Sequence, residues 1–296
     1  MTKEIIAAYR QCKKVALGHY ENFPVGSLLL PQHLRNHIFA LYAFMRSADD
    51  FADLPHRTKK ERVALLEDWR QKLHDAFKGN AQVPTFVALQ DTVQKFDLPI
   101  EPFSLLLDAF TFDAEARVEF PTYDDLHWYT ARSAEPVGQL VLALFGYRDA
   151  ECIRCSNDIC TALQLINFLQ DAKEDLVNGR CYFPKVDYTS FGISTAHEIL
   201  TSPYSSKLIL FESERVERLL ESGAHLPSLV RGRLRFELKA VLAGAQIMIK
   251  KIRDLHGDTL RHRPTLSRFE KTKIIISGFA ASQDFYRTRA VGTHDE

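Results

Sequence analysis

The sequence lacks the features that mark secreted, membrane-spanning and general nucleic-acid-binding proteins. It has no apolar run near the roughly 18 residues that a membrane span needs, and residues 1–6 do not resemble the apolar core of a secretory signal. Basic and acidic residues number 38 each, so the formal net charge is zero and no nucleic-acid partner is expected. We therefore expect a cytoplasmic protein.

Cysteine is also scarce, and the five thiols form no disulfide or zinc pattern. An odd number of cysteines without a secretory signal favours reduced thiols. Cys152 and Cys155 have the spacing of a zinc or redox pair, but a structural zinc site needs four ligands and no second such pair occurs. We interpret these cysteines as small apolar core residues.

Hydrophobic residues recur at helical spacing through most of the chain, and no segment has the convincing two-residue alternation of a strand. With 296 residues, 46% of them hydrophobic, the chain is long enough to bury a large core. No flexible linker divides it, so we predict an all-α protein with a single domain over residues 1–296. We expect a loop at 180–191 and helices at 3–17, 31–54, 58–77, 84–96, 102–112, 122–145, 149–177, 194–201, 203–222, 227–256 and 266–281.

A polar stripe on the predicted helix 149–177 is the first candidate site. At about 100° per residue, Gln164, Asn167, Asp171 and Asp175 fall within roughly an 80° arc of one face. Leu, Ile and Phe residues surround them, so the stripe suits neither an apolar core nor a solvated surface. Unpaired carboxylates in an apolar setting would take up protons, whereas a bound cation would keep them charged. The stripe therefore predicts one half of a metal site.

A second acidic stripe lies at the end of the predicted helix 31–54. Tyr42, Arg46, Asp49 and Asp53 share roughly a 60° arc, and Asp50 lies beside them. The alternative is an ordinary solvated helix end. Acidic residues near a helix C-terminus oppose the helix dipole, however, and the first stripe has the same unfavourable placement. Two such helix ends, facing one another across a bundle, would form the acidic walls of a metal site.

The ligand types indicate which ion and substrate such a site would take. Ligands with oxygen only favour hard cations, and Mg²⁺ in proteins typically uses one or two carboxylates, waters and phosphate oxygens. A phosphate or diphosphate substrate is therefore implied. Arg46 and Arg180 would bind its remaining charge, and the alternative for each is an ion pair with the same aspartates.

Apolar side chains near both stripes suggest that the substrate also carries a hydrocarbon tail. Each of these residues, taken alone, is better explained as ordinary core. They favour a substrate with a long apolar chain and a diphosphate only because they accompany the two acidic stripes. The aromatic candidates for lining a tunnel are Phe23, Phe39, Phe44, Phe51 and Phe168.

The two stripes together resemble a known pair of motifs. Tyr42-x3-Arg46-x2-Asp49-Asp50-x2-Asp53, with Gln164-x2-Asn167-x3-Asp171-x3-Asp175-x3-Gly179-Arg180-x-Tyr182-x-Pro184, is similar to the squalene/phytoene synthase family. The resemblance runs from His19 to about Arg268. It implies an all-helical isoprenoid synthase bundle in which two Asp-rich helices hold Mg²⁺ ions against a prenyl diphosphate, above a central hydrophobic cavity.

Shorter segments resemble one branch of that family, the hydroxysqualene synthases of bacterial hopanoid biosynthesis. They are residues 19–24, 133–141, 167–171 and 263–268. Family members that join two farnesyl diphosphates usually have Arg where this chain has Gln170. The resemblance thus implies a reaction that begins from presqualene diphosphate, needs Mg²⁺ and no NADPH, and yields hydroxysqualene by water capture. A neutral substitution at Gln170 is the alternative explanation.

Two classes of alternative function remain open at this point. The same class of enzyme includes presqualene diphosphate, squalene and phytoene synthases. A member that has lost catalysis would act as an assembly or interaction factor, although such a protein has no reason to keep both acidic motifs. A catalytic member would have a functional partnership with other enzymes of the squalene and hopanoid pathway.

The resemblance also implies roles for individual residues. For the tyrosines among them, buried packing with a satisfied hydroxyl is the alternative. The implied metal ligands are Asp49, Asp50, Asp53, Asn167, Asp171, Glu174 and Asp175; the substrate-binding residues are His19, Asn22, Phe23, Arg46, Val137, Gly138, Arg180 and Arg263; and the catalytic residues are Tyr42, Arg46, Tyr129, Gln164, Gln170, Arg180 and Tyr182.

A basic segment near the C-terminus suggests a peripheral membrane contact, because the product would be apolar and stored in a membrane. The alternative is the solvated face of an amphipathic helix. The segment contains Arg261, Arg263, Arg268, Lys271 and Lys273 beside the apolar residues 274–276.

Overall fold

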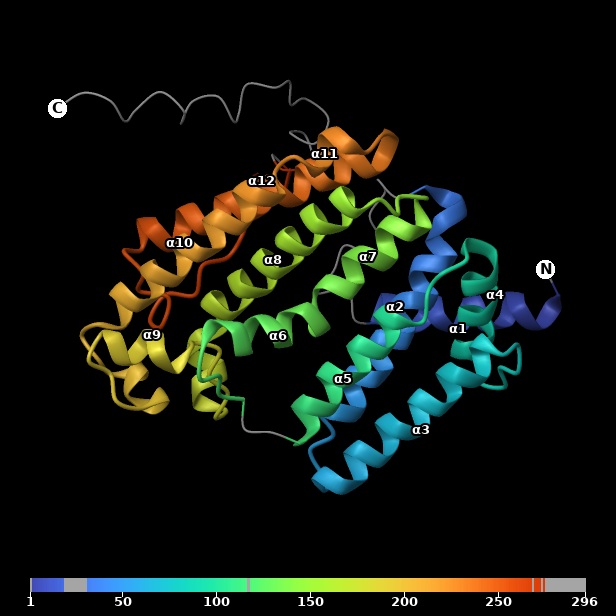
Figure 1. The fold of residues 1–296 in the computed structure, drawn as a ribbon, viewed down its shortest axis with the longest axis horizontal. Coiled ribbons are helices and arrows are strands. Elements are labelled where there is room, and N and C mark those ends of the chain that lie inside the picture. Colours follow the sequence, from blue (N-terminus) through green and yellow to red (C-terminus); the bar gives the residue numbers. More distant parts are fainter. Residues whose placement is uncertain (1, 19–30, 116–117, 268, 273, 275–296) are drawn as a thin grey trace.

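The computed structural model describes residues 2–18, 31–115, 118–267, 269–272 and 274, and the all-α prediction is confirmed for them (Figure 1). Within these residues, β-structure is limited to an isolated parallel bridge between Glu119 and Cys181. None of the described helices is long and apolar enough to cross a membrane. In chain order the helices are α1 (Lys3–Gly18), α2 (Gln32–Ala52), α3 (Lys59–Phe77), α4 (Pro84–Phe96), α5 (Glu101–Glu115), α6 (Tyr123–Ser133), α7 (Glu135–Leu144), α8 (Ala150–Val177), α9 (Lys185–Ser190), the 3₁₀ helix η1 (Ala196–Leu200), α10 (Ser205–Gly223), α11 (Leu226–Leu229) and α12 (Gly232–Asp254).

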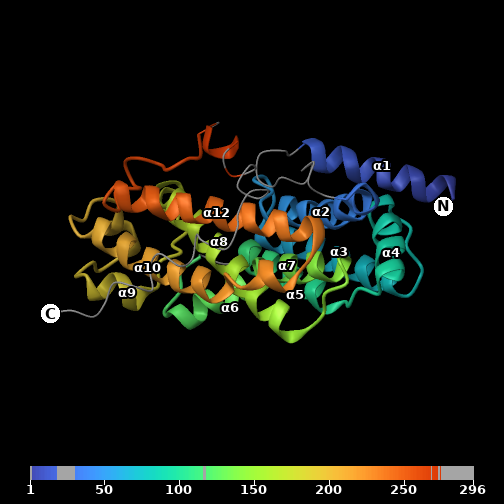
Figure 2. The ribbon, with the colours of Figure 1, turned by 90° about the horizontal axis from the view of Figure 1, so that it is seen from above.

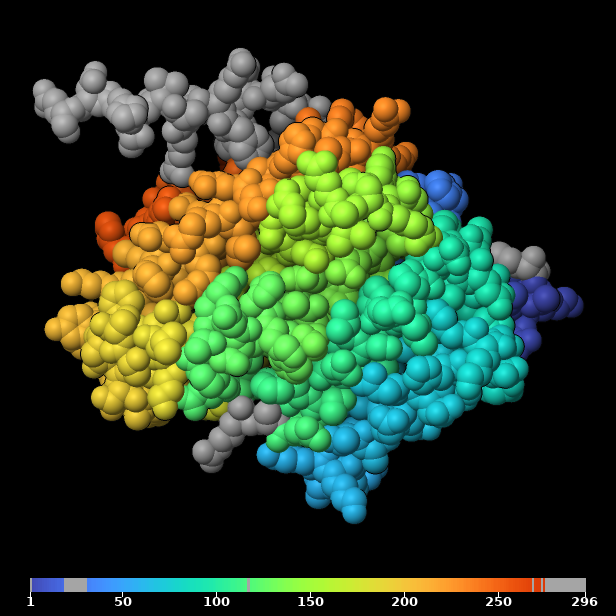
Figure 3. Space-filling view, in the orientation of Figure 1, coloured from blue at the N-terminus to red at the C-terminus, as the bar shows by residue number. Residues whose placement is uncertain are grey.

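The helices pack around two hydrophobic cores that meet at α7. Helices α1–α5 surround the first core, which includes Phe44 and Trp69. The second core lies mainly among α6, α8, α10 and α12 and includes Phe168. Helix α7 contributes Leu140 to the first core and Leu142 to the second. Seen from above, the two sets of helices occupy opposite ends of an elongated molecule (Figure 2). The space-filling view in Figure 3 shows the two sets lying against each other.

Helix α8 runs through the second core between α7 and α10 (Figure 1). Its 28 residues begin after Asp149, whose side chain caps the helix by accepting a hydrogen bond from the Cys152 amide at 2.9 Å. The chain leaves the other end through Gly179, whose φ of +76° lies in the left-handed region that favours glycine. The acidic stripe therefore lies on a long helix with a defined start and end.

The segment that follows α8 is fixed by backbone hydrogen bonds to the segment that precedes α6. The Cys181 amide donates to the Val118 carbonyl at 2.6 Å, and the Lys185 amide donates to the Phe120 carbonyl at 2.8 Å. These bonds hold Arg180 and Tyr182, the two neighbours of Cys181, close to the segment that precedes α6.

The prediction of one helix over 122–145 is wrong, because two helices occupy this range. Helix α6 ends at Ser133 and α7 begins at Glu135, with Ala134 between them at φ −120° and ψ −48°. Pro136 causes the break, since proline has no amide hydrogen to donate and its ring collides with the carbonyl four residues earlier. Thr122 and Asp125 form a capping box at the start of α6.

Three further predictions of local structure need correction. The expected loop at 180–191 contains the short helix α9, which starts directly after Pro184. The expected helix 227–256 is divided into α11 and α12 by an extended segment and by Gly232, which has a φ of +63°. The expected helix 194–201 is the 3₁₀ helix η1. Most of the expected helix 266–281 lies outside the described residues.

All five cysteines have unpaired thiols. Cys152 and Cys155 are buried in the second core, which confirms that they fill apolar space. Burial raises the pKa of the Cys152 thiol to about 12.

Gly138 lies where α7 crosses closest to α8. An added Cβ would lie 2.4 Å from Ser156 Oγ and 2.6 Å from Cys160 Sγ, much closer than side chains allow. Packing therefore explains a glycine here. Neighbouring Val137 packs against the first core, and the implied roles of both residues in substrate binding stay predictions.

We expect Gly138→Ala to destabilise the protein, because the Ser156 and Cys160 side chains would have to leave their positions or α7 and α8 would have to separate. Over-packing of this kind should lower the free energy of unfolding by about 1–3 kcal/mol, measured by urea denaturation. Gly244→Ala is the matched control, since a Cβ added at this helical glycine would lie 3.6 Å from Ile274 Cδ1, an ordinary contact distance. Equal losses of stability in the two variants would contradict the close approach at Gly138.

Candidate active site

The two acidic helix ends predicted to face one another do so, and Arg180 lies between them. Its Nη1 is 3.8 Å from Asp53 Oδ1 at the end of α2, and its Nε is 3.7 Å from Asp175 Oδ1 on α8. Both distances fit ion pairs rather than short hydrogen bonds. The guanidinium of Arg180 therefore links two acidic helix ends that lie about 120 positions apart in the sequence.

Arg46 pairs with its own helix. Its Nη1 is 3.0 Å from Asp49 Oδ2, and its Nη2 is 2.5 Å from Asp50 Oδ1. Tyr42, one turn earlier, is half-buried, and burial raises the pKa of its phenol. Both Arg46 and Arg180 thus form ion pairs with aspartates, as the alternative interpretation of these arginines expects.

A cavity of about 290 Å³ opens beside this pair of helix ends. Helix α8 supplies one wall with the predicted stripe, and the segment after it supplies Arg180 and Tyr182. The sequence prediction that these polar side chains share one surface is therefore correct. The cavity is lined by Gln164, Asn167, Phe168, Asp171, Glu174, Asp175, Arg180 and Tyr182.

Aromatic rings form the apolar side of the cavity. Phe168 and Tyr182 stack face to face, with ring centroids 3.7 Å apart and planes 1° from parallel. Tyr129 and Phe120 continue the cluster, each with its centroid about 6 Å from that of Tyr182. The π faces of such rings attract positive charge, so they provide an apolar surface that tolerates a cation.

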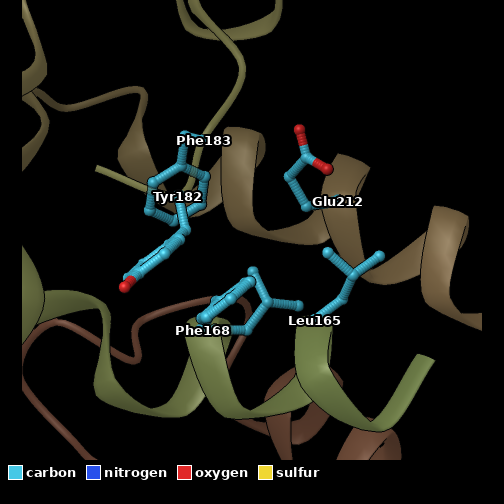
Figure 4. A pocket seen from close by; sticks show the side chains of 6 residues that line it. Leu165, Phe168, Tyr182, Phe183 and Glu212 are labelled. Atoms are coloured by element: carbon cyan, nitrogen blue, oxygen red, sulfur yellow. The ribbon is translucent and has the colours of Figure 1, made fainter. Parts of the chain in front are cut away.

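A small void lies beside the Phe168–Tyr182 pair (Figure 4). Its volume of about 10 Å³ is far below that of a hydrocarbon chain. Glu212 is 5% exposed there, and burial raises the pKa of its carboxyl to about 8, although Arg215 lowers it. The void is lined by Leu165, Phe168, Leu169, Tyr182, Phe183 and Glu212.

Asp113 is a site residue that the sequence interpretation missed. Its Oδ2 accepts a hydrogen bond from the Tyr129 hydroxyl at 2.9 Å, and its Oδ1 is buried without a hydrogen-bond partner. Burial raises the pKa of its carboxyl to about 7, and the charges of Asp49 and Asp53 add to the increase. The signal in the sequence was an acidic residue in an apolar helix end, but the predicted helix 102–112 stopped one residue short of it.

The carboxyl groups around the cavity suit a bound cation. Burial raises the pKa of Asp49 and raises that of Asp175 to about 6, against the opposing effect of nearby arginines. Among the described residues, no three Asp, Glu, His or Cys side chains converge on one ion position.

The segment after α12 also reaches the site. Arg263 Nε lies 2.5 Å from Asp171 Oδ1, and Gln170 Nε2 donates to the Pro264 carbonyl at 3.0 Å. Gln170 thus binds backbone rather than lining the cavity described above. The predicted contribution of Arg263 to substrate binding remains compatible with this position.

Several predicted residues lie elsewhere. Phe44 is fully buried and Phe51 partly buried, and both pack against Trp69, so the ordinary core interpretation is correct for them. Phe39 is likewise part of the first core. Phe168 does line the cavity. The predicted residues His19, Asn22 and Phe23 lie outside the described residues.

Comparison with known proteins identifies relatives of the whole arrangement. The family model described as squalene/phytoene synthase matches residues 17–270. The chain is 34% identical over 180 residues to presqualene diphosphate synthase of Rhodopseudomonas palustris, which covers 61% of this chain and 63% of that protein. It is 30% identical over 283 residues to hydroxysqualene synthase of Sinorhizobium fredii, which covers 94% of this chain and 93% of that protein.

Solved structures agree with the fold. The squalene synthase HpnC from Alicyclobacillus acidocaldarius superposes with a TM-score of 0.80 at 37% identity, over 86% of this chain and 97% of that one. A dehydrosqualene synthase with bound ligand superposes with a TM-score of 0.78 over 94% of this chain and 97% of that one, at 24% identity. The predicted isoprenoid synthase bundle is therefore confirmed.

The Asp113 carboxyl should make stability depend on pH. Its pKa of about 7 in the folded protein exceeds the value of about 4 for an unfolded chain. Between these values the folded state keeps a proton that the unfolded state has lost, so the contribution to stability falls as pH rises. Asp113→Asn should consequently stabilise the metal-free protein by about 2 kcal/mol at pH 8 and change little at pH 4.5, measured by urea denaturation with a chelator.

Glu115→Gln, at an exposed position of the same helix, is the control for removing a negative charge. A stability gain from Asp113→Asn that is the same at both pH values, or that Glu115→Gln reproduces, would contradict the raised pKa of Asp113.

Proposed function

The chain belongs to the squalene/phytoene synthase family, and on that basis we propose that it converts presqualene diphosphate and water to hydroxysqualene and diphosphate. The observation that carries the proposal is the position of Arg180, between two acidic helix ends and next to the stacked rings of Phe168 and Tyr182. Sites for the diphosphate and for a carbocation are thereby adjacent. The hydroxysqualene synthase relative, matched over 94% of this chain, supports the choice within the family.

In this proposal the acidic residues and Asn167 would hold Mg²⁺, directly or through water. When bound, Mg²⁺ supplies the positive charge that lets diphosphate leave. Arg46 and Arg180 exchange their carboxylate partners for phosphate oxygens, which Arg binds in bidentate fashion. The residues assigned to the metal are Asp49, Asp50, Asp53, Asn167, Asp171, Glu174 and Asp175.

Aromatic side chains receive the organic cation that remains after the carbon–oxygen bond breaks. Tyr129, Tyr182 and Phe168 present π faces that stabilise it while it rearranges. A water molecule then forms the new carbon–oxygen bond and loses one proton. Asp113 is suited to accept that proton, because its Oδ1 has no other partner and its Oδ2 is fixed by Tyr129.

This reaction balances without a reductant, so no NADPH is required. Its product is apolar and needs an acceptor, either a membrane surface or another enzyme of the squalene and hopanoid pathway. Phe269, which is 77% exposed beside Lys271, is a candidate for that contact.

Product analysis tests the proposal. We expect hydroxysqualene from presqualene diphosphate with Mg²⁺ alone, and no product from farnesyl diphosphate, with or without NADPH. Similarity to a presqualene diphosphate synthase suggests the main competing reaction. Accumulation of presqualene diphosphate from farnesyl diphosphate would refute the proposed reaction. Phytoene or squalene as the main product would refute it as well.

Asp171→Asn should abolish turnover while the protein stays folded, because it removes a metal-binding charge that lines the cavity. Loss of a transition-state charge contact typically costs a factor of roughly 10²–10³ in kcat. The measurement is initial rate at saturating Mg²⁺, with circular dichroism to check the fold. Asp124→Asn, at an exposed position of α6, is the matched control. Full activity of Asp171→Asn would contradict the metal role of this carboxylate and would favour a metal-independent reaction.

A further inference from the structure

The segment 261–267, here called the strap, follows α12 without regular secondary structure and yet is fastened to two helices. Gln170 Nε2 on α8 donates to the Pro264 carbonyl at 3.0 Å, and Lys251 Nζ on α12 donates to the Thr265 carbonyl at 2.9 Å. Pro264 is buried, and Leu266 packs against the second core. Side-chain donors to its backbone therefore hold the strap in one register.

This register determines where Arg263 lies. Arg263 precedes Pro264 in the strap, and Asp171 follows Gln170 in α8, so the two adjacent pairs form a two-point contact. Arg263 Nε is 2.5 Å from Asp171 Oδ1, at the edge of the cavity that Asp171 lines. One contact is a neutral hydrogen bond to backbone, and the other is a charged pair.

The charged pair is too exposed to fix the strap by itself. The side chains of Arg263 and Asp171 are 57% and 35% exposed, and pairs of this kind contribute little because water screens them. The Gln170 hydrogen bond acts on backbone next to a buried proline, so it restricts the strap more effectively. Because Gln170 is neutral, it also leaves Asp171 to Arg263.

We propose that Gln170 is a positioning residue, whose amide anchors the strap so that Arg263 is held at the rim of the cavity for the diphosphate of the substrate. This inference rests on the proposed function for the identity of that ligand. A divalent cation bound by Asp171 would replace Arg263 as its partner, and the guanidinium would then be free to bind phosphate oxygens. Arg263 touches the ligand, and Gln170 acts only through Arg263.

The test compares Gln170→Ala, Arg263→Gln and the double variant in the full-length protein. Hydrogen–deuterium exchange of peptides covering 261–267 reports the strap, and the thermal shift produced by inorganic diphosphate with Mg²⁺ reports anion binding. Steady-state kinetics with presqualene diphosphate separate KM from kcat. Gln94→Ala, the same substitution at an exposed position of α4, is the matched control.

We expect Gln170→Ala to speed exchange in the strap, reduce the thermal shift and raise KM roughly threefold to tenfold with a smaller change in kcat. Arg263→Gln should raise KM by roughly tenfold or more. The double variant should be no worse than Arg263→Gln, since both substitutions remove the same ligand contact. Additive effects on KM, or unchanged exchange in Gln170→Ala, would overturn the proposal.

The exchange and thermal-shift measurements do not depend on which product forms. If the enzyme acts on farnesyl diphosphate instead, the proposed reaction fails, but these two readouts still decide the role of Gln170. If the reaction is as proposed and Gln170→Ala has the strap exchange and diphosphate response of the native protein, the positioning role fails alone.

Discussion

The crowding of negative charge at the C-terminal ends of α2 and α8 is the constraint on which the site depends. Each end carries the negative pole of its helix in addition to its aspartates, and burial raises the pKa of Asp49 and Asp175. The arginines that compensate keep side-chain exposures of 28% for Arg46, 39% for Arg180 and 57% for Arg263. Such pairs are individually weak and exchangeable. A site built in this way can release its own arginines to a charged ligand at little cost.

The helices that carry these charged residues are held rigidly, whereas the ion pairs between the residues can be exchanged. Helix α8 is enclosed by α7 and α10, and close contact at Gly138 leaves α7 no room to shift toward it. Backbone hydrogen bonds from Cys181 and Lys185 hold the segment after α8 that carries Arg180 and Tyr182. Tyr182 then stacks on Phe168, which belongs to α8 itself. Charged atoms can thus change partners while the aromatic surface beneath them keeps its position.

Helical periodicity was sufficient to predict which residues share one face of a helix. It was insufficient to predict contacts between residues of different helices. The stripe from Gln164 to Asp175 follows from 3.6-residue geometry, and its common face is observed in the cavity wall. The break at Pro136 has a known local cause, yet the apolar pattern continued through it and suggested one helix. Asp113 has no motif around it, so only the packing of α5 against the site reveals it. The buried phenylalanines of α2 satisfied the pattern for a tunnel and for a core equally well.

Gln170 shows why a single position should be interpreted with its tertiary partner. In the sequence, a neutral residue before Asp171 implied a diphosphate site with one cation fewer. In the structure, its hydrogen bond to Pro264, 94 positions away, accompanies an arginine that lies against Asp171. Positive charge beside that carboxylate is therefore present, although a different segment provides it. A neutral residue at position 170 therefore does not leave the Asp171 carboxylate without a cation. The positive charge at this site depends on where Arg263 and Arg180 lie, and these positions are set by the strap and by the segment after α8.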